Sequence, residues 1–595
     1  MRKVIFTLLI LLVPTTTVFA ETEIETVIED IIEWKKQEQG ISNQSPLLQN
    51  PFLKQAGTTA GDWYPFALGR IGYSDDFEAY LATIEHTVKE RYKREIKLDA
   101  TKATEWHRIS LAIAATGGDP TDVNGINLIA DGTYNRAEIS PLNLQGINGW
   151  IWGLITLDSM RYQIPEDAIT SREEMIKGIL SSQLPDGGFS FYHDTADADI
   201  TAMVLQALAP YVNSFETFTY IEQATKKEVT KSIRTVVEEA LLALSELQLE
   251  TGDFGSWGEA NAESTAQVLV ALSALQIDPL NDQRFIKNGV TILDGLMSYR
   301  QEDGGFIHAK TYNADNPTSL PDESNSMASE QVLYALIAYK RWKEDVRSLY
   351  DLRPEMDKTI KDKIQKLEQQ LLTKQLSKNQ ILNILKQYED IPVQETMYID
   401  HFETLQQAVK QLNIKYETKD FHQKMGQLNK GKGTITPLLS QEVAVEINVE
   451  MIENFIQKKK YSTTDYNSVL RFIRYLEEQD NEALLEELYL IQNRIEDLQA
   501  EIESVNEQIL KHLYPISDIT LEDRKLVEEI ANRFNKIPKE DQQQIVNHED
   551  LQQISAIITS LERALWLKRG LIIMSCFLVI LLVWRVWRKR KGANV

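Results

Sequence analysis

Two kinds of side chain that could do chemistry, carboxylates and aromatic rings, lie close together in the first half of the sequence. Aromatic walls with a few polar groups are a common composition of ligand pockets. The aromatic residues and acids in and beside a set of glycine-rich turns therefore form a predicted binding site. Its candidate residues are Trp63, Tyr64, Trp150, Trp152, Phe191, Tyr192, Asp197, Asp199, Trp257, Glu263, Phe306 and Glu330.

Paired carboxylates could also act as a general acid and a general base. Asp199 with Glu263 is one such pair, and Asp197 lies two residues before Asp199. The chain has 88 Asp and Glu residues, however, so accidental pairs are common. We therefore predict no catalytic residue, and keep Asp199 and Asp197 as the alternative if the protein is an enzyme.

Cysteine and histidine narrow the possible chemistry further. The single cysteine, Cys576, excludes an internal disulfide framework and any zinc site built from several thiolates. The histidines of the first half have no short metal-ligand spacing, so structural or surface positions are the simpler interpretation. These are His86, His107, His193 and His308. We predict no metal and no cofactor.

The candidate residues belong to a sequence repeat. The turn Gln183-Leu-Pro-Asp-Gly-Gly-Phe189 recurs as Gln248–Phe254 and as Arg300–Phe306. The helix-like segments that follow the turns have leucines at intervals of 64 residues, and weaker copies begin near Trp63 and Gly149. Such a period indicates stacked supersecondary units.

The repeat predicts an all-α fold, with a ring or solenoid of helix pairs over residues 55–345. Helices rich in Ala and Leu suit an inner layer, and charged helices such as Asp76–Lys93 and Lys227–Gln248 suit an outer one. The turn glycines accept left-handed backbone geometry, which lets the chain reverse. Thr201 and Thr265, each behind an acid, resemble helix starts.

Residues 55–345 resemble the α/α-toroid repeats of squalene cyclases, prenyltransferase β-subunits and transcobalamin-like proteins. The turns are similar to the Gln-x-x-x-Gly-x-Trp motif of the cyclases, with Phe in the Trp position. Stretches such as GDWYPFALGRIG, residues 61–72, are similar to bacterial exported proteins with this repeat. The resemblance implies an α/α-toroid, and the transcobalamin-like branch implies a corrinoid or another small molecule as ligand.

Each activity in these families implies particular residues. Protonating cyclases use Asp-x-Asp-Asp-Thr-Ala, of which the segment Asp197–Ala202 keeps the middle acid, Asp199, but has Ile200 for the third. Protein prenyltransferases need a cysteine zinc ligand and thioester domains need a reactive cysteine, whereas residues 55–345 contain no cysteine. The departures from these motifs favour a head without catalysis.

The two ends of the chain predict an exported, membrane-anchored protein. Residues 1–20 have the basic start, short apolar run and small final residues of a signal peptide. Residues 566–587 are long and apolar enough for a transmembrane helix, and the basic residues 588–595 are typical of a cytoplasmic tail. We expect a single-pass cell-membrane protein whose N-terminal ectodomain is extracellular.

Charge excludes one class of partner. The formal net charge is −25, and the segment from Glu21 to Leu567 carries 54 Lys and Arg against 88 Asp and Glu, a net of −34. Nucleic-acid recognition requires a basic surface, so we predict no nucleic-acid partner.

The rest of the ectodomain is interpreted as a stalk. We predict an N-terminal helical segment at 21–54, a helical stalk at 346–480, a coiled coil at 481–514 and a three-helix module at 515–565. The module resembles a spacer repeat of Gram-positive surface proteins. The coiled coil could pair two chains in a homodimer or fold back on Lys361–Tyr388. Its seam consists of Leu484, Leu488, Ile491, Ile495, Leu498, Ile502, Val505 and Ile509.

These patterns favour a cell-surface protein whose ring-shaped head binds an unknown small molecule or surface partner. Two alternatives remain open. One is an extracytoplasmic enzyme on the same ring, terpene-cyclase-like or glycan-acting, that uses Asp199. The other is a structural or assembly protein that works through the coiled coil.

Overall fold

The fold is predominantly helical, so the predicted all-α class is confirmed. The structure, a computed structural model, describes residues 21–591 except 137–138, 257, 315, 317–318, 374, 417–420, 427, 429–430, 437, 440–447, 466–468, 470–471, 474, 477–480, 515, 517–518, 540, 543–544 and 546–547. The predicted signal peptide, 1–20, lies outside the described residues. The chain divides into two compact units, Met1–Gln441 and Glu442–Val595, and each is considered by itself.

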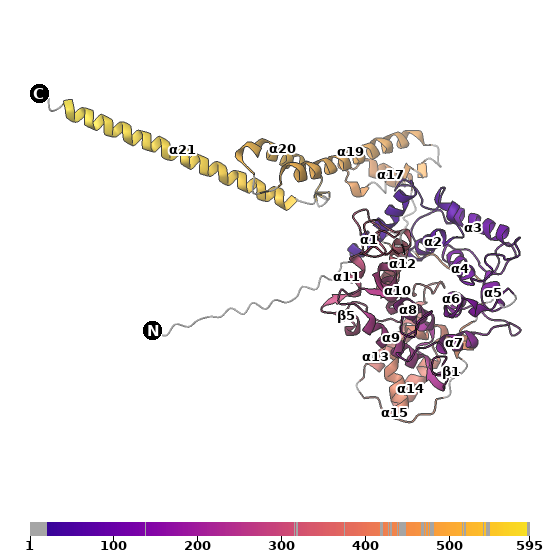
Figure 1. The fold of residues 1–595 in the computed structure, drawn as a ribbon. Coiled ribbons are helices and arrows are strands. Elements are labelled where there is room, and N and C mark those ends of the chain that lie inside the picture. The colour runs from indigo at the N-terminus through magenta and orange to yellow at the C-terminus, as the bar shows by residue number, and fades with distance from the viewer. Residues whose placement is uncertain are drawn as a thin grey trace, which may run out of the picture. The chain divides into compact units, whose positions relative to one another are not determined.

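The first unit is built around inner helices that lie side by side and close on themselves. Each inner helix packs against the next one, and α12 packs against both α10 and α2. In Figure 1 these helices surround the centre of the unit. They are α2 (Thr59–Ile71), α4 (Thr104–Ala115), α6 (Ile147–Ser159), α8 (Ala198–Leu208), α10 (Ala262–Ala274) and α12 (Ser326–Lys343). Every residue of α10 is buried, because this Ala- and Leu-rich helix has neighbours on all sides.

Outer helices cover the inner ones. α3 and α5 pack on α4, α7 on α6, α9 on α8, α11 on α10 and α1 on α12 (Figure 1). These helices are α1 (Glu21–Glu38), α3 (Phe77–Arg91), α5 (Leu128–Gly132), α7 (Arg172–Leu180), α9 (Ile233–Leu247) and α11 (Ile292–Met297). α3 buries Tyr80, Ile84 and Val88, which repeat every four residues and so form one apolar stripe.

The predicted helix over Lys227–Gln248 begins later than expected. The alternating residues of β2 (Glu228–Ser232) pair antiparallel with β1 (Thr217–Ile221), from Thr217↔Ser232 to Ile221↔Glu228. α9 starts only after Ser232, whose hydroxyl accepts the N–H of Thr235 at 3.2 Å. There are two smaller antiparallel hairpins. In the first, β3 (Phe254–Ser256) pairs with β4 (Glu259–Asn261), starting at Phe254↔Asn261. In the second, β5 (Ile286–Lys287) pairs with β6 (Val290–Thr291), starting at Ile286↔Thr291.

The carboxyl-terminal ends of the inner helices form the base of the ring, which is crossed by residues 345–356 and by the described residues within 421–439. Arg70 in α2 donates from Nε to the carbonyl of Leu349 at 2.7 Å. The N–H of Leu438 donates to the carbonyl of Ile71, the last residue of α2, at 2.9 Å. The two late segments are therefore held against the base.

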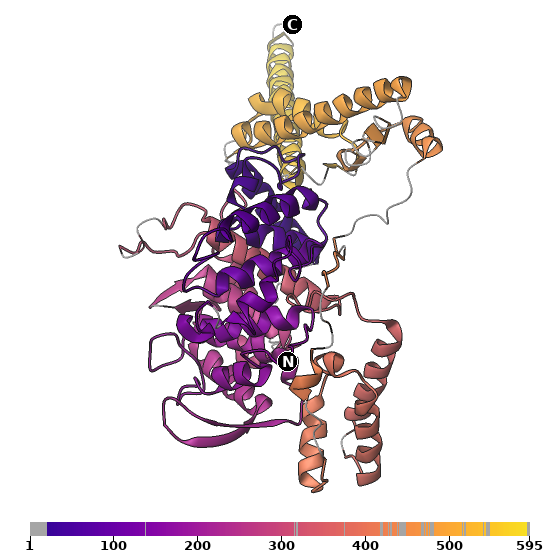
Figure 2. The same ribbon diagram turned by 90° about the vertical axis from the view of Figure 1, so that its right-hand side faces the viewer.

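Helices α13 (Lys358–Leu371), α14 (Lys378–Glu389) and α15 (Phe402–Gln411) share an apolar core of their own. They are the salmon helices that lie together in Figure 2. Buried Glu395 attaches them to the ring by ion pairs with Arg347 (2.7 Å) and Arg353 (2.8 Å). The first compact unit ends at Gln441, so the predicted stalk, 346–480, is divided between the units.

Both units also contain short helices. They are η1 (Phe52–Gln55), η3 (Leu142–Gln145), η4 (Ala209–Tyr211), η5 (Gln283–Phe285), η6 (Val393–Tyr398), α16 (Phe421–Lys424), η7 (Thr463–Asp465) and η9 (Leu521–Asp523).

In the second unit the predicted coiled-coil segment is one long helix, α19 (Glu482–His512). Its seam is covered by the same chain. Leu488, Ile491 and Ile495 share a core with α17 (Val449–Ile456). The seam residues from Ile502 to Ile509 share another with α20 (Arg524–Phe534) and the start of α21 (His548–Lys591).

Helix α21 continues from this core into an exposed apolar stretch. The part within Asp550–Arg585 is long and apolar enough to cross a membrane, by length and composition. Across the described part of the chain it is the one helix that meets this criterion. It covers most of the predicted span, 566–587. Of the predicted tail, residues 592–595 lie outside the described residues.

Candidate functional site

The repeat turns bring several predicted residues to the amino-terminal ends of the inner helices, which we call the mouth of the ring. Asp197, Asn261 and Asn325 are 64 residues apart and begin α8, α10 and α12. Each side chain accepts a backbone N–H three residues further on, at 2.7–3.1 Å. Asp197 is thus a helix cap, and α8 and α10 start three residues before the predicted starts at Thr201 and Thr265.

The hydroxyl groups of Thr201 and Thr265 do not start the helices but anchor the repeat turns. The backbone N–H of Phe254 donates to Thr265 Oγ1 at 3.0 Å, and that of Phe306 donates to the Ser329 hydroxyl at 2.9 Å. Thr201 binds the first turn in the same way, at 2.9 Å. Phe306 is fully buried. The repeated aromatic and the repeated hydroxyl therefore join each turn to the helix that follows it.

Asp199, Glu263 and His308 lie together at the mouth. His308 Nδ1 is 2.8 Å from Glu263 Oε2, and this hydrogen bond raises the pKa of His308. Burial raises the pKa of Asp199 to about 7, and the charges of Asp197 and Glu263 add to that effect. Among the described residues, Asp199 Oδ1 has no hydrogen-bond partner. Asp199 is therefore a carboxyl group that gains or loses its proton near neutral pH.

Glu330 adds a third acid to the mouth. Its side chain is only 2 % exposed, and its Oε2 also lacks a hydrogen-bond partner within the described residues. Burial raises its pKa well above the usual range, although Lys35 and Arg108 act in the opposite direction. We call Asp199, Glu263, Glu330 and His308 the acid centre.

Three charged residues beside the acid centre were not predicted. Arg108 in α4 pairs with buried Asp62 of α2 at 2.9 Å. Lys35 in α1 donates to the Ser326 hydroxyl at 2.7 Å. Arg108, Asp62 and Lys35 do not belong to a repeat turn. A charged residue in a helical stretch is ordinarily a surface residue. The sequence therefore contained no signal for them.

Aromatic rings from distant segments meet in the centre of the ring. Trp63 contacts Trp152 and Tyr334, with centroid distances of 5.5 and 5.6 Å. Trp152 also contacts Tyr350, at 5.8 Å. The Tyr334 hydroxyl accepts a hydrogen bond from Gln267 at 2.6 Å. Trp63 and Trp152 are half-buried, whereas Tyr334 and Tyr350, which were not predicted, are buried. These rings form an aromatic column.

The other predicted residues lie apart from this column. Tyr64 is fully buried. Half-buried Trp150 fills the space above Gly178, where an added Cβ would lie 2.8 Å from the indole. Phe191 and Tyr192 contact one another at 4.2 Å, and Tyr192 is 72 % exposed. Trp257 lies outside the described residues.

The chemistry of the site follows from its carboxyl groups. Within the described ranges, no three His, Cys, Asp or Glu side chains are grouped as metal ligands would be. Carboxyl oxygens that lack a partner can accept hydrogen bonds from a cationic or hydroxylated ligand, and half-buried Trp faces can stack on it.

Comparison with protein-family models, with curated proteins and with solved structures finds no match to this chain.

Proposed function

We propose that the first unit is an α/α-toroid head that binds a positively charged small molecule, or a charged group of a surface partner, without transforming it. The closed series of inner helices and their outer cover support the toroid. We further propose that a signal peptide exports the head and that α21 holds it outside the membrane in a single pass. The apolar stretch within α21 supports the anchor.

One observation carries the binding proposal. Asp199 Oδ1 and Glu330 Oε2 are buried acceptors that form no hydrogen bond within the described residues, although the Ser264 hydroxyl lies close enough to Asp199 to lower its pKa. An unsatisfied buried acceptor costs about 1–3 kcal/mol, so a donor that reaches both oxygens gains binding energy by satisfying them. A bound cation would also stabilise the ionised form of the carboxyl groups. The aromatic faces of Trp63 and Trp152 would attract the cation.

Native mass spectrometry of the full chain, released from the membrane of its own host, tests this proposal. We expect a retained molecule on the wild-type protein that is lost from the Asp199→Asn, Glu330→Gln double variant. The matched control is Glu246→Gln, which removes an exposed acid from α9 and should keep the molecule. Equal retention by the double variant would overturn the proposal.

The alternative of an extracytoplasmic enzyme is favoured by a separate observation. A pKa of about 7 lets Asp199 donate a proton at neutral pH, and Glu263 supplies a second carboxyl group close by. Turnover of soluble glycans or of an isoprenoid alkene by the full chain would reveal such an enzyme. Asp199→Asn should then abolish turnover, whereas retained activity would exclude Asp199 as the acid.

A further inference from the structure

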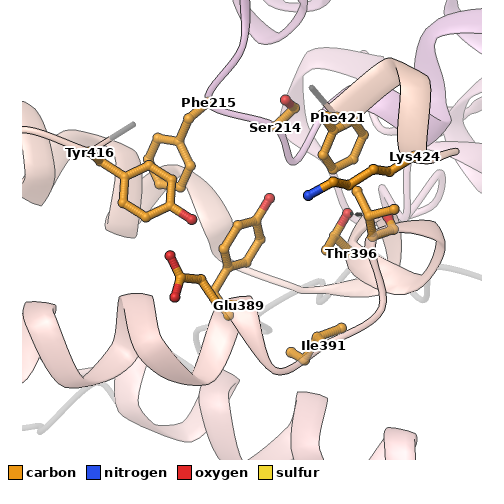
Figure 3. A pocket seen from close by; sticks show the side chains of 10 residues that line it. Ser214, Phe215, Glu389, Ile391, Thr396, Tyr416, Phe421 and Lys424 are labelled. Atoms are coloured by element: carbon orange, nitrogen blue, oxygen red, sulfur yellow. Dashed lines mark hydrogen bonds between the residues drawn. The ribbon is translucent and has the colours of Figure 1, made fainter. Parts of the chain in front are cut away.

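A cavity lies near the base of the ring, away from the mouth. Its volume is about 150 Å³. It is formed where the loop after η4 meets the end of α14, η6 and α16 (Figure 3). The lining residues are Ser214, Phe215, Tyr388, Glu389, Ile391, Val393, Thr396, Tyr416, Phe421 and Lys424. All of them belong to the first unit.

The aromatic walls of this cavity are held in place by one another. Phe215 contacts Tyr416 at 4.8 Å and Tyr388 at 5.7 Å, measured between ring centroids. The Tyr388 hydroxyl donates to the carbonyl of Asn213 at 2.7 Å, which fixes that ring. The cavity is therefore pre-formed, and a volume of about 150 Å³ accommodates a single benzene ring.

The hydroxyl groups in the lining already have partners. Thr396 Oγ1 donates to the carbonyl of Val393 at 2.9 Å, and the Ser214 hydroxyl accepts the N–H of Glu216 at 3.0 Å. These hydrogen bonds help to hold the cavity together. The charged side chains of the lining, Lys424 and Glu389, are the groups that can select a ligand by its charge.

Lys424 and Glu389 present opposite charges from opposite sides of the cavity. In Figure 3 the Lys424 ammonium points inward beside Thr396 and Phe421, and the Glu389 carboxylate lies beside Tyr416. Both side chains are exposed at the rim, and within the described residues neither forms an ion pair. Burial and the Glu389 carboxylate raise the pKa of Tyr416 to about 12, so the phenol keeps its proton.

We propose that this cavity binds a free aromatic α-amino acid. The aromatic ring would fill the space between Phe215, Tyr416 and Phe421. The ligand carboxylate would face Lys424 and its ammonium would face Glu389, so the zwitterion matches both charges of the rim. This site is separate from the mouth and does not depend on the function proposed for it.

Isothermal titration of the full chain in detergent with L-phenylalanine tests the proposal. Phenylacetate keeps only the negative group of the ligand, and phenethylamine keeps only the positive one. We expect L-phenylalanine to bind about tenfold or more tightly than either, because each lost charge-assisted hydrogen bond weakens binding by about that factor. N-acetylphenylalanine amide, which lacks both charges, should show no binding.

Two variants test which rim residue binds which charged group of the ligand. Lys424→Gln should weaken phenylacetate at least tenfold and leave phenethylamine unchanged, and Glu389→Gln should do the reverse. Lys410→Gln, which removes another exposed lysine of the same helical layer, is the control and should change neither. All three positions are exposed, so the variants should fold. Absence of binding by the wild type, or affinities that both variants leave unchanged, would overturn the proposal.

Discussion

At the scale of single residues, Asp199 differs from an ordinary surface acid in its protonation. It lies in the first turn of α8, where a carboxylate would normally be stabilised by the helix dipole. Burial and two neighbouring acids outweigh that benefit and raise its pKa to about 7. A residue held in an unfavourable environment at the mouth of the ring is typical of a functional position.

Replacing Asp199 should change how stability depends on pH. The folded pKa of about 7 lies above the unfolded value of about 3.9, so between these values the folded protein binds a proton that the unfolded chain has released. The contribution of Asp199 to wild-type stability therefore falls as the pH rises from about 4 to 7. We expect Asp199→Asn to be more stable at pH 8 by about 2–4 kcal/mol, with a difference that disappears near pH 4.

Chemical unfolding followed by tryptophan fluorescence, measured at intervals from pH 4 to pH 8, checks this expectation. Glu246→Gln removes an exposed carboxyl group and should follow the wild-type profile. Parallel profiles for Asp199→Asn and the wild type would show that Asp199 does not titrate in this range.

At the scale of elements, the turn and the helix that follows it form the repeating unit. Gly187, Gly252 and Gly304 have φ values of 91°, 82° and 89°, which other residues adopt only with strain. An added Cβ at Gly252 would also lie 2.3 Å from the carbonyl oxygen of Thr291. The regular spacing of these turns within the chain therefore reflects backbone geometry and the hydroxyl anchors.

Thr265→Val should test the anchor with little change in shape. The methyl group that replaces Oγ1 cannot accept the N–H of Phe254, so a fully buried donor loses its partner. We expect a loss of about 1–3 kcal/mol in the free energy of unfolding. Thr265→Ser keeps the hydroxyl and should lose less. Equal losses in the two variants would contradict the anchoring role.

The seam of α19 leads to a second prediction at this scale. Leu488 and Ile495 are buried against the chain itself, in the core shared with α17. Changing both to Lys should loosen that core, because a buried ammonium is costly. We expect faster hydrogen exchange over 449–512 and an unchanged mass of the full chain in native mass spectrometry. A mass that falls by half would instead support the predicted homodimer.

At the scale of the whole molecule, buried charges join segments that are far apart in the sequence. Burial alone would raise the pKa of Asp351, but Arg353, Arg161 and Arg347 hold it well below its usual range. Glu395 behaves similarly, with burial outweighed by Arg347 and Arg353. This network is the physical reason that the base of the ring and α13–α15 belong to one compact unit.

Glu395→Gln should release α13–α15 from the base. It leaves Arg347 and Arg353 with one negative partner fewer in a buried place, which costs about 3–5 kcal/mol. We expect faster proteolysis within 357–411, and Asp390→Asn, an exposed acid of the same layer, should leave the rate unchanged. Because the folded pKa of Glu395 is lowered, wild-type protection should be full above about pH 5 and should decline in stronger acid.

The proposed anchor gives the last prediction. Ending the chain after Leu565 removes the exposed apolar stretch of α21 while keeping the apolar residues that α21 contributes to its own core, which end at Ile558. The full chain should stay with membranes after alkaline carbonate extraction, and the shortened chain should be released. Retention of the shortened chain would require another membrane attachment.

Local patterns could be predicted from the sequence because they depend on neighbouring residues. The apolar period predicts the helical class, the turn glycines predict the chain reversals, and uninterrupted hydrophobicity predicts the apolar stretch of α21. The sequence does not distinguish β2 from an amphipathic helix, because the alternation of β2 extends over only five residues. It also predicts helix starts at Thr201 and Thr265, whereas the helix caps are Asp197 and Asn261.

Tertiary structure alone decides which of these residues meet. Glu330 becomes a buried acid because α1 and α4 bring Lys35 and Arg108 beside it, and the α19 seam is satisfied by α17, α20 and α21. The cavity near the base joins Phe215 to Lys424, more than 200 positions apart. Burial and electrostatic coupling depend on distances in space, which sequence spacing specifies only within one helix or turn.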